Sequence, residues 1–238
     1  SLAANTTASY NTAIGWQSML ATAGAGTFNT GVGARSLETN TTGDDNTAVG
    51  VNSMFSNATG NENTGVGRNS LYATTGSYNT AVGNSALSAN TTASHNTASG
   101  YHALYANTTG TRNIAIGFSA YDAADTEDNN LAIGYDALGG AIDGGEKNVA
   151  IGNYSLDANT SGGWNTAVGY DAMTTNIGGD KNTSIGFQSL QANTEGNKNV
   201  AVGMYSMYAN TTASDNVAVG YESLKVNTTG TSNTALGY

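Results

Sequence analysis

Acidic side chains gather in one stretch of the sequence, YDAADTEDN at residues 121–129. Asp122, Asp125, Glu127 and Asp128 would supply carboxylate oxygens, which are ligands that Ca²⁺ prefers in proteins. The segment GGAIDGGEKN at 139–148 invites the same interpretation. Both segments depart from the pattern of the sequence around them, which favours solvated loops over calcium sites.

The two histidines, His95 and His102, are the other candidates for catalysis or metal binding. Equivalent places elsewhere in the sequence carry unrelated residues such as Asp215 and Glu222, so we interpret both histidines as surface residues. No Ser/His/Asp set, phosphate-binding loop or zinc-ligand spacing is present. The sequence therefore predicts neither an enzyme nor a bound cofactor.

Aromatic residues give a better functional clue, because they recur at one place in a repeat. The candidates for sugar contact are Tyr101, Tyr135, Tyr170 and Tyr221. The same place is aromatic at Trp16, Phe118, Phe187 and Tyr238. An exposed row of rings would suit stacking on glycans. The alternative, packing of the rings within the fold or between subunits, is favoured.

A repeat of about seventeen residues runs through the whole chain. Each copy opens with Asn-x-small-aliphatic-Gly, and we number repeat positions from this asparagine. The fourteen anchors are Asn11, Asn29, Asn46, Asn63, Asn79, Asn96, Asn113, Asn130, Asn148, Asn165, Asn182, Asn199, Asn216 and Asn233. Such a fixed period indicates an array of stacked structural units.

The first five positions predict a short strand followed by a corner. Position two is Thr or aliphatic, and position four is aliphatic except at Ser99, so these side chains form one strand face. Position three is always Ala, Gly or Ser, which predicts that another layer packs closely on the second face. Position five is always glycine, which reaches positive φ without a steric penalty.

The remaining positions add a second apolar anchor and a polar turn. Position nine is Leu or Met in every copy that reaches it except at Tyr121, and Asn-Thr-Thr-Gly or a close variant follows. One unit cannot bury its own apolar residues, but stacked units can. The sequence therefore predicts an all-β fold, a parallel β-solenoid or β-roll of fourteen coils of about seventeen residues. The anchor asparagines should stack in a ladder of side-chain amides.

Composition excludes several classes of function. The net charge of −10 argues against nucleic acid as a partner, since phosphates need a basic surface. No stretch reaches the length of a membrane span, so we expect no membrane insertion. The chain has no cysteine, which removes disulfides and cysteine-based metal sites.

Three short units carry a resemblance to a known family: NIAIG at 113–117, NVAIG at 148–152 and NVAVG at 199–203. Each is followed three positions on by Ser or Ala, and each resembles the repeats of trimeric autotransporter adhesin heads. The longer pattern, close to NTAVGxxALxxNTTGxx at 79–95 and 96–112, also resembles repeat arrays of phage tail-fibre-like proteins. The resemblance implies a left-handed parallel β-roll that assembles as a homotrimer.

These observations favour a structural and adhesive fibre segment, the shaft or head of a cell-surface adhesin or a phage tail fibre. Its location would be extracellular, on a cell surface or a virion, and its partners would be copies of itself and host-surface glycans or a receptor. The alternative is an ice-binding β-solenoid, suggested by the ranks of threonine. Threonine at position two exchanges with aliphatics and looks buried, which disfavours that alternative.

Three further expectations concern assembly and modification. The array, residues 1–238, is interpreted as a segment of a longer fibre, and the phase from Tyr238 back to Ser1 and Leu2 would also allow end-to-end filaments. Glutamate at Ala48, Ala115 and Ala201 should separate subunits that pack on the small-residue face. If the chain meets a glycosylation pathway, the asparagines of the NTT turns should be modified in preference to Asn153.

Overall fold

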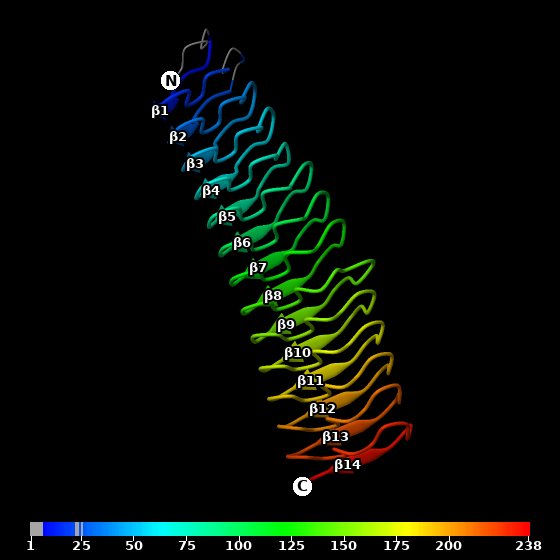
Figure 1. Ribbon diagram of the computed structural model, residues 1–238. Coiled ribbons are helices and arrows are strands. Elements are labelled where there is room, and N and C mark those ends of the chain that lie inside the picture. Colours follow the sequence, from blue (N-terminus) through cyan, green and yellow to red (C-terminus); the bar gives the residue numbers. More distant parts are fainter. Residues whose placement is uncertain (1–6, 22–23, 25) are drawn as a thin grey trace. The chain divides into compact units, whose positions relative to one another are not determined.

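The computed structural model describes residues 7–21, 24 and 26–238, which form short strands and no helix (Figure 1). Ser1, Leu2 and Asn5 lie outside the described residues. The strands are β1 (Thr12–Ile14), β2 (Thr30–Val32), β3 (Thr47–Val49), β4 (Thr64–Val66), β5 (Thr80–Val82), β6 (Thr97–Ser99), β7 (Ile114–Ile116), β8 (Leu131–Ile133), β9 (Val149–Ile151), β10 (Thr166–Val168), β11 (Thr183–Ile185), β12 (Val200–Val202), β13 (Val217–Val219) and β14 (Thr234–Leu236).

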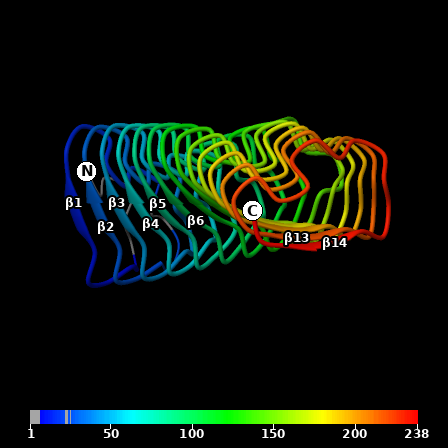
Figure 2. The same ribbon diagram turned by 90° about the horizontal axis from the view of Figure 1, so that it is seen from below.

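The chain divides into two compact units, residues 1–116 with β1–β7 and residues 117–238 with β8–β14. Within each unit every strand pairs in parallel with the next strand along the chain. The register matches repeat position to repeat position, as in Thr47 with Thr64 and Val200 with Val217. Successive coils in each unit have similar outlines (Figure 2). These features confirm the predicted all-β parallel solenoid.

The small residue at position three points into the coil, not outward. In β2–β13 this middle residue is buried, whereas its neighbours at positions two and four are partly or fully exposed. The interior is narrow here: a Cβ atom added at Gly31 would lie 2.8 Å from Ser18 Oγ and 3.1 Å from Met19 Cε. The layer that demands small residues is therefore the opposite wall of the coil itself.

This orientation corrects two expectations. The prediction that a neighbouring subunit packs on the small-residue face is wrong, because Ala48, Ala115 and Ala201 are completely buried inside their coils. Glutamate at these positions would disrupt the coil and not merely separate subunits. The prediction that threonine at position two is buried is also wrong, since Thr12 and Thr80 are exposed and Thr47 is half-buried.

The largest buried side chains of the core stand at position nine, which confirms the second apolar anchor of each repeat. Leu37, Met54, Leu190 and Met207 are completely buried. Tyr121 replaces this residue in one coil and is also buried, and its hydroxyl accepts a hydrogen bond from Asn130 Nδ2 at 2.6 Å. Burial raises the pKa of Tyr121 above its ordinary value.

The invariant glycine forms the predicted corner. Gly134 has a φ of +140°, and a Cβ atom there would lie 2.6 Å from the carbonyl oxygen of Gly152 in the next coil. Real Cβ atoms do not approach a carbonyl this closely, so only glycine lets adjacent coils stack at the corner.

The anchor asparagines form the predicted ladder. The backbone N–H of Asn199 donates to Asn182 Oδ1 at 2.9 Å, and Asn199 Nδ2 donates to the carbonyl of Ala213 at 2.8 Å. Asparagines at position twelve make a second ladder, in which Asn193 Nδ2 donates to Asn176 Oδ1 at 2.8 Å. These buried amides are thus hydrogen-bonded from coil to coil, as buried polar groups require, whereas Asn107 Oδ1 in the second ladder is buried with no hydrogen-bond partner among the described residues.

The second ladder overturns the expectation for glycosylation. The turn asparagines are buried within hydrogen-bonded turns, and they include Asn40, Asn57, Asn90, Asn107, Asn159 and Asn210. Asn153, in contrast, is exposed at the outer surface of its coil. The order of accessibility is therefore the reverse of the one expected from the sequence.

Candidate interaction surface

Each unit has an outward strand face, defined by the side chains at positions two and four of β1–β7 in the first unit and of β8–β14 in the second. Ile116 and Ile185 are each 40% exposed, and Val49 is 37% exposed. Adjacent coils repeat at about 4.8 Å and alternate residues along a strand at about 6.6 Å, so the face is a regular array. Its chemistry is a mixture of methyl groups and threonine hydroxyls.

The two units differ in the chemistry of this face. Position two is threonine in all of β1–β6, the first six strands of residues 1–116. In residues 117–238 the same position is aliphatic in four strands, as in Val149 and Val200, and threonine in the other three, as in Thr166. The first unit therefore presents a more hydroxylated face and the second a more apolar one.

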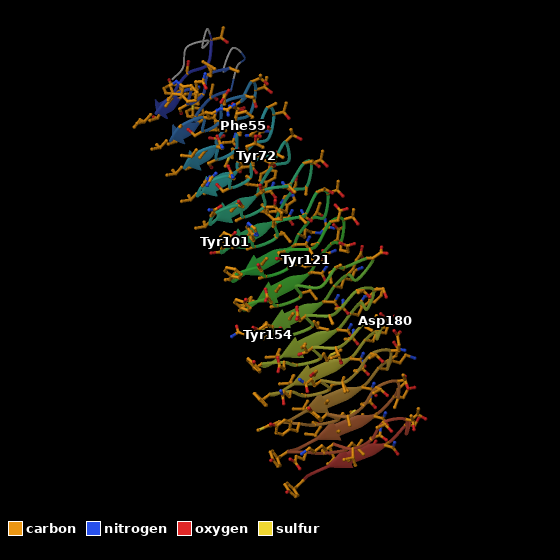
Figure 3. All side chains as sticks on the ribbon, in the orientation of Figure 1. Phe55, Tyr72, Tyr101, Tyr121, Tyr154 and Asp180 are labelled. Atoms are coloured by element: carbon orange, nitrogen blue, oxygen red, sulfur yellow. The ribbon has the colours of Figure 1, made fainter. Side chains whose placement is uncertain are left out.

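An unbroken row of aromatic rings runs along residues 117–238 beside the strand face. We call it the aromatic row, and its members are Phe118, Tyr135, Tyr154, Tyr170, Phe187, Tyr205, Tyr208, Tyr221 and Tyr238. Neighbouring ring centroids lie 5.2 to 6.5 Å apart. Figure 3 shows Tyr154 on the edge of the coils opposite to Asp180.

The row is continuous because aromatic residues at two different repeat positions contribute to it. Position six supplies most of the rings, but it is Asn153 in one coil and Met204 in another. In both coils the next residue is aromatic, and Tyr154 and Tyr205 occupy the gap with edge-on contacts to their neighbours. This compensation is visible in the sequence only when the two positions are considered together.

The glycan candidates all lie at the surface. Three of them belong to the aromatic row: Tyr135, Tyr170 and Tyr221, which are 42%, 44% and 44% exposed. The fourth, Tyr101, lies in residues 1–116, is 44% exposed and stacks on His102 with ring centroids 4.0 Å apart. Of the two kinds of packing that were favoured, within the fold or between subunits, packing inside the coil is therefore wrong. Because Tyr170 stacks on Phe187 with an interplanar angle of 11°, a sugar would meet ring edges and hydroxyl groups more than free ring faces.

The acidic calcium candidates do not form a shared site. Glu127 is buried, and its carboxylate accepts hydrogen bonds from the backbone N–H groups of Asp125, Thr126 and Gly144 at 3.1 to 3.2 Å. It closes a turn in which Ala124 replaces the usual asparagine. Among the described residues no group of three or more acidic, His or Cys side chains could hold a metal ion. In the segment 139–148, Glu146 pairs with Lys147 at 2.9 Å.

A second acidic cluster in residues 117–238 shares Asp122 with the calcium candidates, but its other members, residues 136, 157 and 171, were missed at the level of sequence. Partial burial and the charges of Asp136, Asp122 and Asp171 raise the pKa of Asp157 above its usual value. Burial and Asp122 raise the pKa of Asp136 in the same way. These residues alternate between positions seven and ten, and only the folded coil brings them together.

Two lysines and both histidines also lie against aromatic rings. The ammonium groups of Lys147 and Lys181 lie 5.0 and 5.6 Å from the centroid of Trp164. His95 stacks on Tyr78 at 4.9 Å, and His102 lies between Tyr101 and Tyr105. Both histidines are thus surface residues packed on tyrosine, as interpreted from the sequence.

The part of the chain that the structure describes contains no pocket. In that same part, no helix is long and apolar enough to cross a membrane. Comparison of the chain with models of protein families, with curated proteins and with solved structures finds no match in any of the three.

Proposed function

We propose that this chain is a structural and adhesive segment of an extracellular fibre, on a cell surface or a virion. The observation that carries the proposal is the aromatic row beside the apolar strand face of residues 117–238. Both repeat with every coil and remain at the surface. A surface that repeats in this way favours many weak contacts acting together.

The strand face also supports the proposal of a homotrimer. Ile185 and Val219 are 40% and 37% exposed on a face whose neighbours are apolar. Contiguous apolar surface of this kind commonly marks contacts between proteins. A trimer would place this face, and not the small-residue face, between subunits.

Light scattering of purified chains tests assembly. The wild type should have the mass of a trimer, and the double variant Ile185→Lys with Val219→Lys should be a folded monomer, because charges on the apolar face oppose close contact. Thr212→Lys, at an exposed turn outside this face, is the control and should remain oligomeric. A wild type that scatters as a monomer at every concentration would contradict the proposed trimer.

Retention on a panel of immobilised neutral and acidic glycans tests adhesion. The triple variant Tyr135→Ser, Tyr170→Ser and Tyr221→Ser should lose at least about tenfold in retention, since loss of each ring contact weakens a multivalent complex. Tyr78→Ser makes the same chemical change outside the aromatic row and should bind as the wild type. Equal retention of the triple variant and the wild type would rule out these tyrosines as the contact.

A second candidate function is ice binding, favoured by one observation. The threonines of β1–β6 face outward in six consecutive coils, so the regular hydroxyl and methyl array that such a function needs lies at the surface. The test is a thermal-hysteresis assay of the wild type and of Thr47→Lys with Thr64→Lys. Hysteresis that the double variant abolishes and Thr212→Lys retains would support it, and its absence in the wild type would exclude it.

A further inference from the structure

The tyrosines of residues 117–238 contact one another as well as the other rings of the row. Five tyrosine pairs have adjacent rings: Tyr135 with Tyr154, Tyr154 with Tyr170, Tyr205 with Tyr208, Tyr205 with Tyr221, and Tyr221 with Tyr238. Their centroids lie 5.3 to 6.5 Å apart. Four of the five pairs join one coil to the next.

We propose that these pairs are a modification site, at which a one-electron oxidant such as a peroxidase with hydrogen peroxide forms dityrosine and so links neighbouring coils covalently. The inference does not rest on the proposed adhesive function. It concerns only the chemistry of phenol rings that the solenoid holds side by side.

Each of two phenols gives up one electron and one proton, and the two phenoxyl radicals couple through the ring carbons next to the hydroxyl-bearing carbons. Each coupled ring then moves the hydrogen on its bonding carbon to oxygen, which restores both phenols. One hydrogen peroxide accepts the two electrons and two protons and becomes two water molecules, and the protein loses two hydrogen atoms per link.

Exposure and distance both suit this reaction. Tyr135, Tyr170 and Tyr221 are 42% to 44% exposed, and Tyr238 is 94% exposed, so an external oxidant can reach a member of each cluster. In dityrosine the ring centroids are about 4.3 Å apart, which is two ring radii plus one carbon–carbon bond of about 1.5 Å. Most of the pairs therefore need to approach by about 1 to 1.5 Å, within the reach of surface side chains that change rotamer.

Phe187 divides the tyrosines into two clusters. Its ring lies between Tyr170 and Tyr205, at 5.6 Å from each, but it has no hydroxyl and forms no phenoxyl radical. Links should therefore form among Tyr135, Tyr154 and Tyr170, and separately among Tyr205, Tyr208, Tyr221 and Tyr238. Phe187→Tyr should join the two clusters.

Residues 1–116 supply a control within the same molecule. Tyr10 stacks on Phe28, Tyr72 on Phe55 and Tyr78 on His95, so the ring partner in each case is not a tyrosine. These tyrosines are partly or fully exposed and meet the same oxidant. They should nevertheless form no link within one chain.

The experiment is oxidation of the purified chain by peroxidase and hydrogen peroxide. Dityrosine fluorescence, intact mass and mapping of the linked peptides are measured on the band that keeps single-chain mobility in a denaturing gel. We expect a loss of two hydrogens per link and links at the five pairs. Oxidation of the same chain in urea should scatter links over all tyrosines.

Variants make the test specific. Tyr154→Phe with Tyr205→Phe keeps both rings but leaves only the pair of Tyr221 and Tyr238. Because neighbouring pairs share a tyrosine, at most three links form at once in the wild type when each ring couples once, so the intrachain yield should fall to about one third. Tyr72→Phe with Tyr78→Phe is the matched control and should leave the yield unchanged. The proposal is overturned if the first variant keeps the wild-type yield, if links map equally to Tyr72 and Tyr78, or if the folded chain forms none while free tyrosine couples.

Discussion

Replacing the corner glycine Gly134 with alanine tests the stacking of coils most sharply. Its φ of +140° is a conformation that alanine rarely adopts, which costs about 1–3 kcal/mol. The new Cβ would also lie 2.6 Å from the carbonyl oxygen of Gly152 and 2.9 Å from the backbone nitrogen of Asn153. Separating the coils to relieve such overpacking costs about 1–3 kcal/mol more. We therefore expect about 2–6 kcal/mol of destabilisation, measured as a lower urea midpoint by circular dichroism.

Gly144→Ala is the matched control for this prediction. Gly144 also has positive φ, at +94°, but nothing lies within 4 Å of a Cβ atom built there. Only the conformational cost of about 1–3 kcal/mol should remain, so its midpoint should fall less. If both variants lower the midpoint equally, contact between stacked corners is not what requires glycine, and the reasoning is refuted.

Two further predictions concern the interior and the acidic cluster. Ala201→Glu should abolish the β-sheet signal in circular dichroism, because it buries an unpaired charge. Val200→Glu, on the outward face of the same strand, should leave the protein folded. If both variants fold equally well, the orientation of β12 is contradicted. Since the pKa of Asp157 is raised in the folded state, stability should fall as pH rises from about 4 through that raised pKa. Asp157→Asn should flatten this part of the profile of melting temperature against pH, and an unchanged profile would show that Asp157 does not cause it.

The sequence predicted the features that every coil repeats. The anchor asparagines, the corner glycines and the apolar residue at position nine each recur in register, and their structural roles follow from hydrogen bonding, backbone freedom and burial. These requirements are local and the same in every coil, so a single chain displays them many times. The parallel solenoid and the ladder from Asn182 to Asn199 could therefore be anticipated.

The same repeat pattern could not show which face of each strand points into the coil. Alternation defines two faces, but small residues at position three suit both a thin interior and a close external partner. At position nine Leu190 and Met207 adopt φ of 51° and 48°, and their buried side chains fill the coil beside the small residues. Positive φ is uncommon for such residues and leaves no mark in the sequence.

Features assembled from different repeat positions were also beyond prediction. The aromatic row needs Tyr154 and Tyr205 at position seven to fill gaps at position six, and the cluster around Asp157 combines positions seven and ten. Likewise, Glu127 serves as a turn acceptor in the place of an absent asparagine. Each of these depends on which side chains the folded coil brings within reach.

Both candidate functions depend on which side chains of each strand face the solvent. A labelling experiment measures that exposure directly. The chain has no cysteine, so Thr47→Cys, Ala48→Cys and Val49→Cys each carry a single thiol in β3. Labelling rates with a water-soluble thiol reagent are compared at dilutions where light scattering reports single chains. We expect fast labelling at 47 and 49, and protection at 48 until the protein is unfolded in urea. Fast labelling at 48 with protection at 47 and 49 would contradict it.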